Sequence, residues 1–353
     1  MIKVKGLHNT AKIFTDNIEE AALKQVKDVL DKEWSKGLKI RVMPDVHVGY
    51  GVPIGYTQTI KDKVIPNFVG VDIGCGMLVT KLSNNPDFKI DFNKLEKTIK
   101  SHVPSGFNVF KNRQDINLNL NDIIANFNYD RALRSVGTLG GGNHFIEINK
   151  SEKGIYLVIH SGSRHLGVEV NRYWNNKIKP NQDYLEKENF DGYLNDMKIV
   201  QKFASINRKR MRDNILRNMK LSYINEFETI HNYIDLEHMI LRKGAISARL
   251  DELVLIPINM RDGSLIAKGL GNPDWNYSAP HGAGRIMSRT EAKQKVPLEK
   301  FKDSMKDVWS KSVSNKTLDE SPFVYKDINE IIENTKDQLV ILERLIPLYN
   351  FKA

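Results

Sequence analysis

Cysteine is almost absent from this 353-residue chain, which contains only Cys75. A single thiol excludes an intrachain disulfide, and the N-terminal residues do not resemble a signal peptide, so we expect a cytoplasmic protein. Long apolar runs are missing too. The runs "IYLVI" (155–159) and "LVLIPI" (253–258) are far shorter than the roughly 18 residues that indicate a membrane span. We therefore expect no membrane-crossing segment.

Acidic residues are outnumbered by basic ones, 43 against 53, which gives a formal net charge of +10. Such a surplus favours a polyanionic partner, because Lys and Arg that neutralise phosphates release counterions. One basic stretch, "INRKRMRDNILRNMK" (206–220), lies in an expected helix. Charge runs on helices are mostly solvated faces, and RNA binding is the alternative hypothesis for this one.

Periodicity and turn residues predict a mixture of helices and strands. A D-x-x-E pattern (Asp16, Glu19) predicts a helix that begins there and ends at Gly37. The remaining expected elements are a strand over 38–47 that is broken at Pro44, two β-rich runs over 63–82, a hairpin turn at 149–154, a helix over 194–221, a second helix through His231 to about His238, β-rich runs over 252–260 and 264–270, and a final helix capped by Asp327 and Glu330. We find no internal repeat, linker or change of composition, which favours one large α+β domain over residues 1–353.

Four of the nine histidines lie beside glycine-rich or proline-broken loops, namely His47, His144, His160 and His281. A histidine at a strand end beside small residues leaves space for a ligand to approach its ring. This repeated setting suggests that several of these histidines are functional.

Asp72 and Cys75 in "VGVDIGCGM" (69–77) form a possible half-site for a metal ion. Glycines at 70, 74 and 76 would let the backbone crowd the ion, although a buried structural cysteine is the common alternative. Together with His144, His160 and His231, the pair becomes a donor set that suits two divalent ions, such as manganese or zinc, bridged by the thiolate. His231 and His238 lie seven positions apart on the expected helix, so spacing alone does not choose between them.

The segment "HGAGR" (281–285) places His281 before small residues and Arg285, with Arg289 close behind. If the imidazole were a nucleophile, the glycines would admit a phosphate and the arginines would hold its charge. A turn with a buried histidine is the alternative. The glycine-rich loop over 137–142 offers backbone N–H groups to an anion, but it lacks the G-K-[ST] ending of a P-loop.

Taken together and in order, the motifs resemble the RtcB family of RNA-splicing ligases. They are "MPDVHVGYGVPIG", "VGVDIGCGM", "GTLGGGNHFIEI", "HSGSRHLG", "FASINR", "HNYIDLE", "RKGAISA", "HGAGRIMSR" and "YKDI", and the resemblance covers about residues 38–353. It implies a single compact α+β domain whose β-sheets form a central metal cleft surrounded by helices. It also implies a GTP- and manganese-dependent ligase, with two Mn²⁺ ions, that joins RNA 3′-phosphate or 2′,3′-cyclic phosphate ends to 5′-hydroxyl ends.

The resemblance assigns a role to each candidate residue. Asp72, Cys75, His144, His160 and His231 would bind the metals, with Cys75 bridging both ions. His281 would be the guanylylated nucleophile, and Asp45 would hold its tautomer. The residues of the guanylate pocket would be Asn143, His144, Phe145, Glu147, Pro257, Asn259, Met260, Ser264, Gly282, Ala283, Gly284, Tyr325 and Lys352, with Glu147 selecting guanine. RNA and phosphate contacts would come from Arg164, Lys243, Arg285 and Arg289.

The chain departs from the family in one pocket segment, "PINMRDGS" (257–264), where the family usually reads P-G-S-M-G. Ile258 and Arg261 therefore bear on pocket shape, and such variation suits a paralogue kept for RNA repair rather than for tRNA splicing. Two alternative functions are a metal-dependent phosphoesterase that only opens cyclic phosphates and a non-catalytic protein that binds RNA ends. We expect a monomer that acts on cleaved tRNA or other broken RNA, with archease as a candidate activator.

Overall fold

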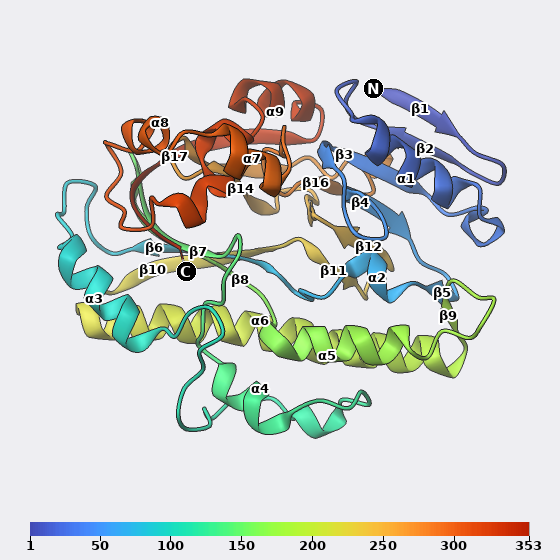
Figure 1. The fold of residues 1–353 in the computed structure, drawn as a ribbon, viewed down its shortest axis with the longest axis horizontal. Helices are drawn as coiled ribbons and strands as arrows, with labels where there is room; N and C mark the ends of the chain where they lie inside the picture. The colour runs from blue at the N-terminus through green and yellow to red at the C-terminus, as the bar shows by residue number, and fades with distance from the viewer. Residues whose placement is uncertain (353) are drawn as a thin grey trace.

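Two large β-sheets dominate the structure, a computed structural model that describes residues 1–352 (Figure 1). The six-stranded sheet has the order β1-β2-β3-β4-β12-β11, with β2 and β3 parallel. Its strands are β1 (Ile2–Lys5), β2 (Thr10–Ile13), β3 (Ile40–His47), β4 (Ile54–Thr59), β12 (Ile240–Lys243) and β11 (Asn232–Asp235).

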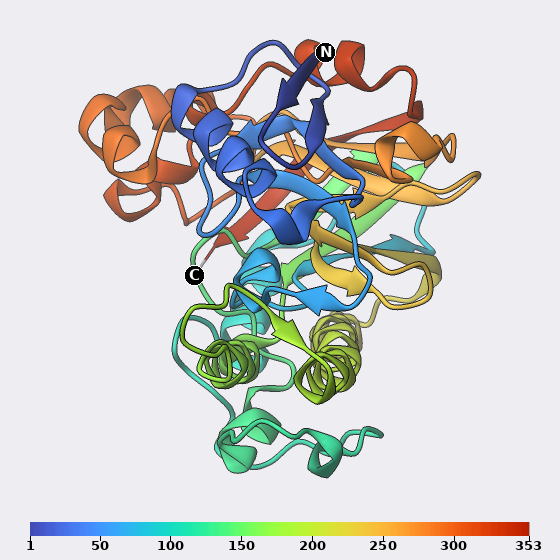
Figure 2. The ribbon, with the colours of Figure 1, turned by 90° about the vertical axis from the view of Figure 1, so that its right-hand side faces the viewer.

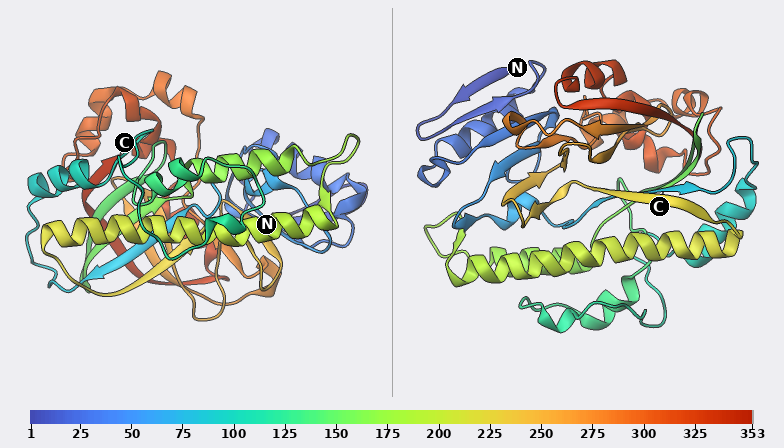
Figure 3. Two further views of the ribbon diagram at one scale, coloured as in Figure 1. Left: turned by 90° about the horizontal axis from the view of Figure 1, so that it is seen from below. Right: turned by 180° about the vertical axis from the view of Figure 1, so that it is seen from behind.

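The seven-stranded sheet has the order β10-β6-β8-β7-β17-β15-β14, and all of its neighbours are antiparallel. It curls strongly along β17, as the views from below and behind show (Figure 3). Its strands are β10 (Tyr223–Ile230), β6 (Gly76–Leu82), β8 (Gly154–Ser161), β7 (Phe145–Ser151), β17 (Leu339–Lys352), β15 (Gly263–Gly269) and β14 (Leu253–Asn259). Two small pairs complete the strands, β5 (Lys63–Val64) with β9 (Leu185–Glu186) and β13 (Ala245–Ser247) with β16 (Ser278–Pro280).

Helices cover the sheets from several sides. α5 and the 32-residue α6 lie side by side below the sheets, and α4 lies below them in turn (Figures 1 and 2). The helices are α1 (Glu20–Leu30), α2 (Pro66–Val69), α3 (Phe92–His102), α4 (Tyr129–Ser135), α5 (Arg164–Asn175), α6 (Glu188–Met219), α7 (Arg289–Lys295), α8 (Leu298–Ser304) and α9 (Ile328–Thr335). No helix within residues 1–352 is both long and apolar enough to span a bilayer.

Strand alternation gives the seven-stranded sheet two different faces. On one face, Ile146, Ile148, Leu157 and Ile159 are buried in a cluster with residues of α3 and α6. The opposite face carries the residues between them in the sequence, such as Glu147. The first face therefore fixes the sheet on the helices, while the opposite face, which buries a second apolar cluster that includes Val79 and Val158, also carries Glu147.

The mixed α+β class expected from the sequence is confirmed, as are the hairpin between β7 and β8 and the final helix, which Asp327 caps by accepting a hydrogen bond from the Asn329 amide. The long helix starts six residues earlier than expected, at Glu188. The strand does not break at Pro44 but continues to His47, with a register shift in its pairing to β4.

Two helix predictions need correction. The expected helix through His231 is wrong, because residues 223–230 form β10, which pairs with β6, and His231 lies between β10 and β11. The β-branched and aromatic residues of "YINEFETI" fit this pairing, and the contact with β6 determines that the segment is a strand rather than a helix. The N-terminal helix spans only Glu20–Leu30, and Glu19, rather than Asp16, is its N-cap.

Candidate active site

Four candidate metal ligands lie at one end of four neighbouring strands. Cys75 precedes β6, His144 precedes β7, His160 is the penultimate residue of β8, and His231 follows β10. Because these strands are antiparallel, the start of one lies beside the end of the next; Gly76 pairs with both Ser161 and Ile230. The topology thus brings together residues that are up to 156 positions apart in the sequence, 231 − 75.

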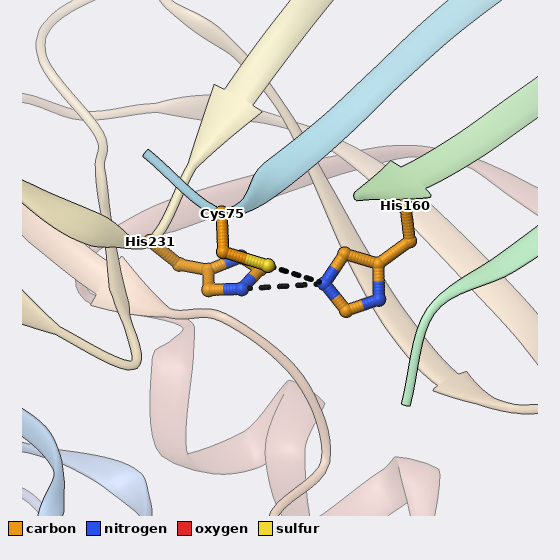
Figure 4. A group of neighbouring side chains, drawn as sticks. All are labelled: Cys75, His160 and His231. Atoms are coloured by element: carbon orange, nitrogen blue, oxygen red, sulfur yellow. Dashed lines mark hydrogen bonds between the residues drawn. The ribbon is translucent and has the colours of Figure 1, made fainter. Parts of the chain in front are cut away.

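The predicted metal ligands form two overlapping groups of three that share the Cys75 thiol. In one group, Cys75 Sγ lies 3.2 Å from His160 Nε2, which lies 3.3 Å from His231 Nε2 (Figure 4). In the other, His144 Nε2 lies 2.9 Å from Asp72 Oδ2 and 3.5 Å from Cys75 Sγ. A shared thiol between two sets of hard and intermediate donors is suited to a pair of divalent cations.

Hydrogen bonds fix the histidine rings in the form that binds metals. The Nδ1–H groups of His144 and His160 donate to the carbonyls of Leu139 and Asn143, at 2.8 and 3.1 Å. The Nε2 atoms then face the shared centre, as in protein metal sites where the second ring nitrogen is held by a carbonyl. The buried Nδ1 of His231 has no partner within residues 1–352.

The electrostatics of the cluster also fit cations. Burial, followed by neighbouring histidines, holds the pKa values of His160 and His231 well below the ordinary range, so both rings are neutral. Burial and then Asp72 raise the pKa of the Cys75 thiol, which a cation would reverse. Desolvation opposes ionisation of Asp72, but His144, the Cys75 thiol and Arg164 together outweigh it and lower the pKa to about 2.

Two α6 residues that sequence reasoning did not place in the site hold these loops together. The fully buried Asn207 accepts hydrogen bonds from the amides of Gly137 and Thr138 and donates to the Gly162 carbonyl. Arg208, also fully buried, donates to the carbonyls of Gly74 and Ser161 at 2.7 Å and pairs with Glu228. The only sequence signal was their place in "FASINR".

These contacts correct two expectations. The basic stretch of α6 is not a uniform RNA-binding face, because Arg208 is fully buried and Arg212 is buried against Glu226. The glycines beside Cys75 serve packing: a Cβ at Gly74 would lie 2.9 Å from Ala204 Cβ, and one at Gly76 would lie 2.6 Å from the Thr229 carbonyl oxygen. Crowding against the metal ligands occurs instead at Gly162, where a Cβ would lie 2.1 Å from Asp72 Oδ1.

Asp72, Cys75, His144, His160 and His231 are the candidate metal ligands, named the metal-ligand cluster below. His281 lies next to this cluster, with its ring centroid 4.9 Å from that of His231. Its Nδ1 lies 2.6 Å from Oδ2 of the fully buried Asp45, and the same oxygen accepts the His281 backbone N–H at 3.1 Å. The proton therefore resides on Nδ1, and Nε2 keeps its lone pair. His47, which the sequence singled out without a role, donates its Nδ1–H to the Asp45 carbonyl at 2.9 Å.

A cavity of about 800 Å³ joins His281 to the metal-ligand cluster. All of the residues that the resemblance assigned to the guanylate pocket line it, except His144 and Ser264. Ser264 is fully buried beside Pro257 on the adjacent strand, and its hydroxyl has no partner within residues 1–352. Ile258 lines the cavity, whereas Arg261 does not and is held by Asp262.

One wall of the cavity carries two buried carboxylates. Glu147 accepts hydrogen bonds from the side chains of Asn350 at 2.6 Å and Asn149 at 3.2 Å, and burial raises its pKa. Glu320, which the sequence did not reveal, pairs with Lys352 at 2.8 Å and Arg289 at 2.6 Å. Burial opposes ionisation of Glu320, but these cations, Lys352 first, outweigh it and lower its pKa to about 2.

The four cations predicted to contact RNA or phosphate fall into two pairs. Arg285 and Arg289 line the cavity, and both lie near Glu320. Arg164 and Lys243 lie outside it and donate to backbone carbonyls, those of Gly106 and Asn67, each at 2.9 Å.

These features define an enzyme active site, because a polarised histidine, a buried cluster of potential metal ligands and a polar cavity meet in one place. The sequence model described as "tRNA-splicing ligase RtcB" matches residues 25–128 and 119–353. Curated relatives include RNA-splicing ligase RtcB of Escherichia coli K12, 33% identical over 87% of this chain and 88% of the relative. Others are RtcB2 of E. coli ATCC 25922, 28% identical over 72% of this chain and 70% of the relative, and tRNA-splicing ligase RtcB of Nanoarchaeum equitans, 26% identical over 84% of each.

The chain therefore belongs to the RtcB family.

Proposed function

We propose that this protein is an RNA ligase that uses GTP to join an RNA 3′-phosphate or 2′,3′-cyclic phosphate end to a 5′-hydroxyl end, with residues 1–353 acting as one ligase domain. The observation that carries the proposal is the Asp45–His281 pair, which directs an imidazole lone pair into the cavity that the metal-ligand cluster borders. The RtcB relatives, named as RNA-splicing ligases, support the substrate class.

Asp45 and His281 account for activation of the nucleotide. Nε2 of His281 attacks the α-phosphorus of GTP, a P–N bond forms, and the bond to the departing pyrophosphate breaks. Asp45 holds the Nδ1 proton and stabilises the positive charge that develops on the ring. The guanylyl group then passes to the RNA 3′-phosphate, and GMP leaves when the 5′-hydroxyl attacks that phosphorus.

The donor set fits two divalent cations, which we propose to be Mn²⁺. Asp72, Cys75 and His144 would hold one ion, and Cys75, His160 and His231 would hold the other. Bound there, the cations would neutralise phosphate charge and activate water for opening a cyclic phosphate.

Guanine selection falls to Glu147 and Lys352. A carboxylate facing the guanine N1 and N2 hydrogens and an ammonium facing O6 would favour GTP over ATP. Asn350 and Asn149 orient the Glu147 carboxylate, and Glu320 orients the Lys352 ammonium.

Labelled GTP tests the proposal directly. Incubation with Mn²⁺ and α-labelled GTP should leave an acid-labile, alkali-stable label on the protein, as expected for a phosphoramidate, and His281→Ala should abolish it. Joining of an RNA pair with 3′-phosphate and 5′-hydroxyl ends should require both GTP and Mn²⁺. Opening of a cyclic phosphate without label or joining would instead identify a phosphoesterase, and absence of both reactions would leave an RNA-end-binding protein.

The physiological RNA needs a separate comparison. We propose repair of broken RNA, since the 257–264 segment departs from the family pattern. Sealing of intron-derived tRNA halves but not of RNA nicked by a ribonuclease toxin would contradict this proposal. Cytoplasmic location, a monomeric state and activation by archease stay predictions.

A further inference from the structure

An apolar side chain stands almost fully in solvent near the metal-ligand cluster. Phe107, in the connection between α3 and α4, is 94% exposed. It follows Gly106 in a tight turn, closed by the hydrogen bond from the Asn108 amide to the Ser105 carbonyl. The Gly106 amide donates to Gly140, which fixes the turn against the glycine-rich loop. Phe107 is thus a large apolar group on a well-anchored backbone, with nothing covering it.

A cation connects this turn to the site. Arg164 donates to the Gly106 carbonyl at 2.9 Å and to the Thr138 hydroxyl at 3.1 Å. It lies two residues after Gly162, where a Cβ would lie 2.1 Å from Asp72 Oδ1. A second cation, Arg131, reaches the Phe107 carbonyl at 3.4 Å. The exposed ring therefore stands beside positive charge at the Asp72 side of the cluster.

The same combination occurs on the His281 side. Tyr50, between β3 and β4, is 75% exposed, and its carbonyl accepts a hydrogen bond from Lys243 Nζ. Tyr50 follows His47 and Val48, which line the cavity together with His281, whereas the Lys243 ammonium itself lies beside Asn67 and Gly70. Within residues 1–352, neither Arg164 nor Lys243 forms a salt bridge with a carboxylate; both donate to backbone carbonyls instead, and Lys243 is buried.

We propose that Phe107 and Tyr50 are stacking platforms for the unpaired bases at the two RNA ends, one platform for each strand. This inference rests on the RNA-ligase function proposed above. Aromatic rings bind single-stranded bases by stacking whatever their sequence, while neighbouring cations hold the backbone. Such binding suits an enzyme that must accept broken ends of many sequences and hold both beside one cluster.

Strand-resolved kinetics test the proposal. The KM of each RNA strand is measured with the other saturating, for the unaltered protein, Phe107→Ala and Tyr50→Ala. We expect each variant to raise the KM of a different strand by about 10-fold or more, with little change in kcat, since stacking contributes to binding rather than to chemistry. Phe107→Trp and Tyr50→Phe should retain low KM values, whereas Phe107→Leu should not.

Two further measurements separate stacking from a structural effect. An abasic nucleotide at the affected end should erase the difference between Phe107→Ala and the unaltered protein, and 2-aminopurine at that end should be quenched by the unaltered protein only. The matched control is Phe88→Ala, 42% exposed beyond the end of β6 remote from Cys75. Four outcomes would each overturn the proposal: KM values that do not change, equal KM shifts in Phe88→Ala, KM shifts for the same strand in both Phe107→Ala and Tyr50→Ala, and KM shifts that persist with abasic ends.

The guanylylation assay shows whether a negative result contradicts the stacking proposal or the RNA-ligase function itself. Label transfer from GTP needs no RNA, so Phe107→Ala and Tyr50→Ala should acquire label as fast as the unaltered protein. If the unaltered protein acquires no label, the proposed function fails. If it does and the KM values do not respond, only the stacking inference fails.

Discussion

Replacing Asp45 with asparagine should slow guanylylation without abolishing it. In the structure, one Asp45 oxygen accepts two hydrogen bonds, from the His281 ring at 2.6 Å and from the His281 backbone N–H at 3.1 Å. An asparagine that places its carbonyl oxygen at this point satisfies both donors. In the flipped amide, the NH₂ group would face the His281 backbone N–H, and two donors would meet without an acceptor. The backbone N–H therefore favours the other orientation, in which the ring proton stays on Nδ1 and Nε2 stays nucleophilic.

The magnitude follows from the charge that is lost. A hydrogen bond to a charged group contributes about 1.5–3 kcal/mol, against about 1 kcal/mol for a neutral one. Attack by Nε2 also places positive charge on the ring, and a carboxylate about 4 Å from a full charge contributes up to about 4 kcal/mol near a protein surface. We therefore expect the barrier to rise by about 2–4 kcal/mol, which would slow guanylylation roughly 30- to 1000-fold.

Single-turnover label transfer from α-labelled GTP measures this rate, with His281→Ala as the blank. Asp196→Asn is the matched control, because Asp196 is also fully buried and hydrogen-bonded but lies on α6, where it binds the Trp174 indole. A loss of about 10⁴-fold would mean that the wrong tautomer forms, as when a triad aspartate is replaced. A loss below about 3-fold would mean that the Asp45 charge plays no part in the step.

Three other changes test the rest of the site. Cys75→Ala should reduce manganese bound per chain, measured by elemental analysis, from two ions to fewer than one, with little change in the metal-free melting temperature, since the thiol belongs to both ligand groups. Glu147→Gln should lower kcat/KM for GTP by about 10-fold or more and leave that for ATP unchanged, because a charged acceptor is lost; an equal fall for both nucleotides would refute the assignment. Glu320 has a folded pKa of about 2 against an ordinary 4.5, so its contribution is present above pH 4.5 and is lost as the pH falls towards 2. The free energy of unfolding of the unaltered protein should therefore be lower by on the order of 3 kcal/mol near pH 2 than at neutral pH because of this group, and Glu320→Gln should flatten this dependence.

The sequence indicated which candidate side chains lie together better than it indicated the elements that carry them. Cys75, His144 and His160 could be identified because each sits at a strand end marked by glycines, and strand ends in an antiparallel sheet meet. His231 was considered together with His238, and only the family resemblance chose between them, since the local pattern suggested a helix that the structure replaces with β10 and β11. Pairing of β10 with β6 is a long-range contact, and no local signal reports it.

Residues that act through others escaped prediction for a different reason. Asn207 and Arg208 lie in a helix whose charges looked like a solvated or RNA-binding face, yet both are fully buried. Glu320 lies 32 positions from Lys352, and only the folded chain brings their charges to 2.8 Å. Burial of a polar group depends on what packs over it, which the surrounding sequence does not state.

The hydrogen bonds from α6 to the loops that carry the candidate metal ligands bear on which metal ion the site would accept. Asn207 and Arg208 fix the loops from outside by backbone hydrogen bonds, so the spacing of the donors is set by the polypeptide rather than by the ion. A flexible set of ligands rearranges around whichever metal arrives and then follows the general affinity order of the metals. Loops held by one helix would require each metal to accept the arrangement as it is, and with metals bound as proposed, α6 would act as the template against which competing ions are selected.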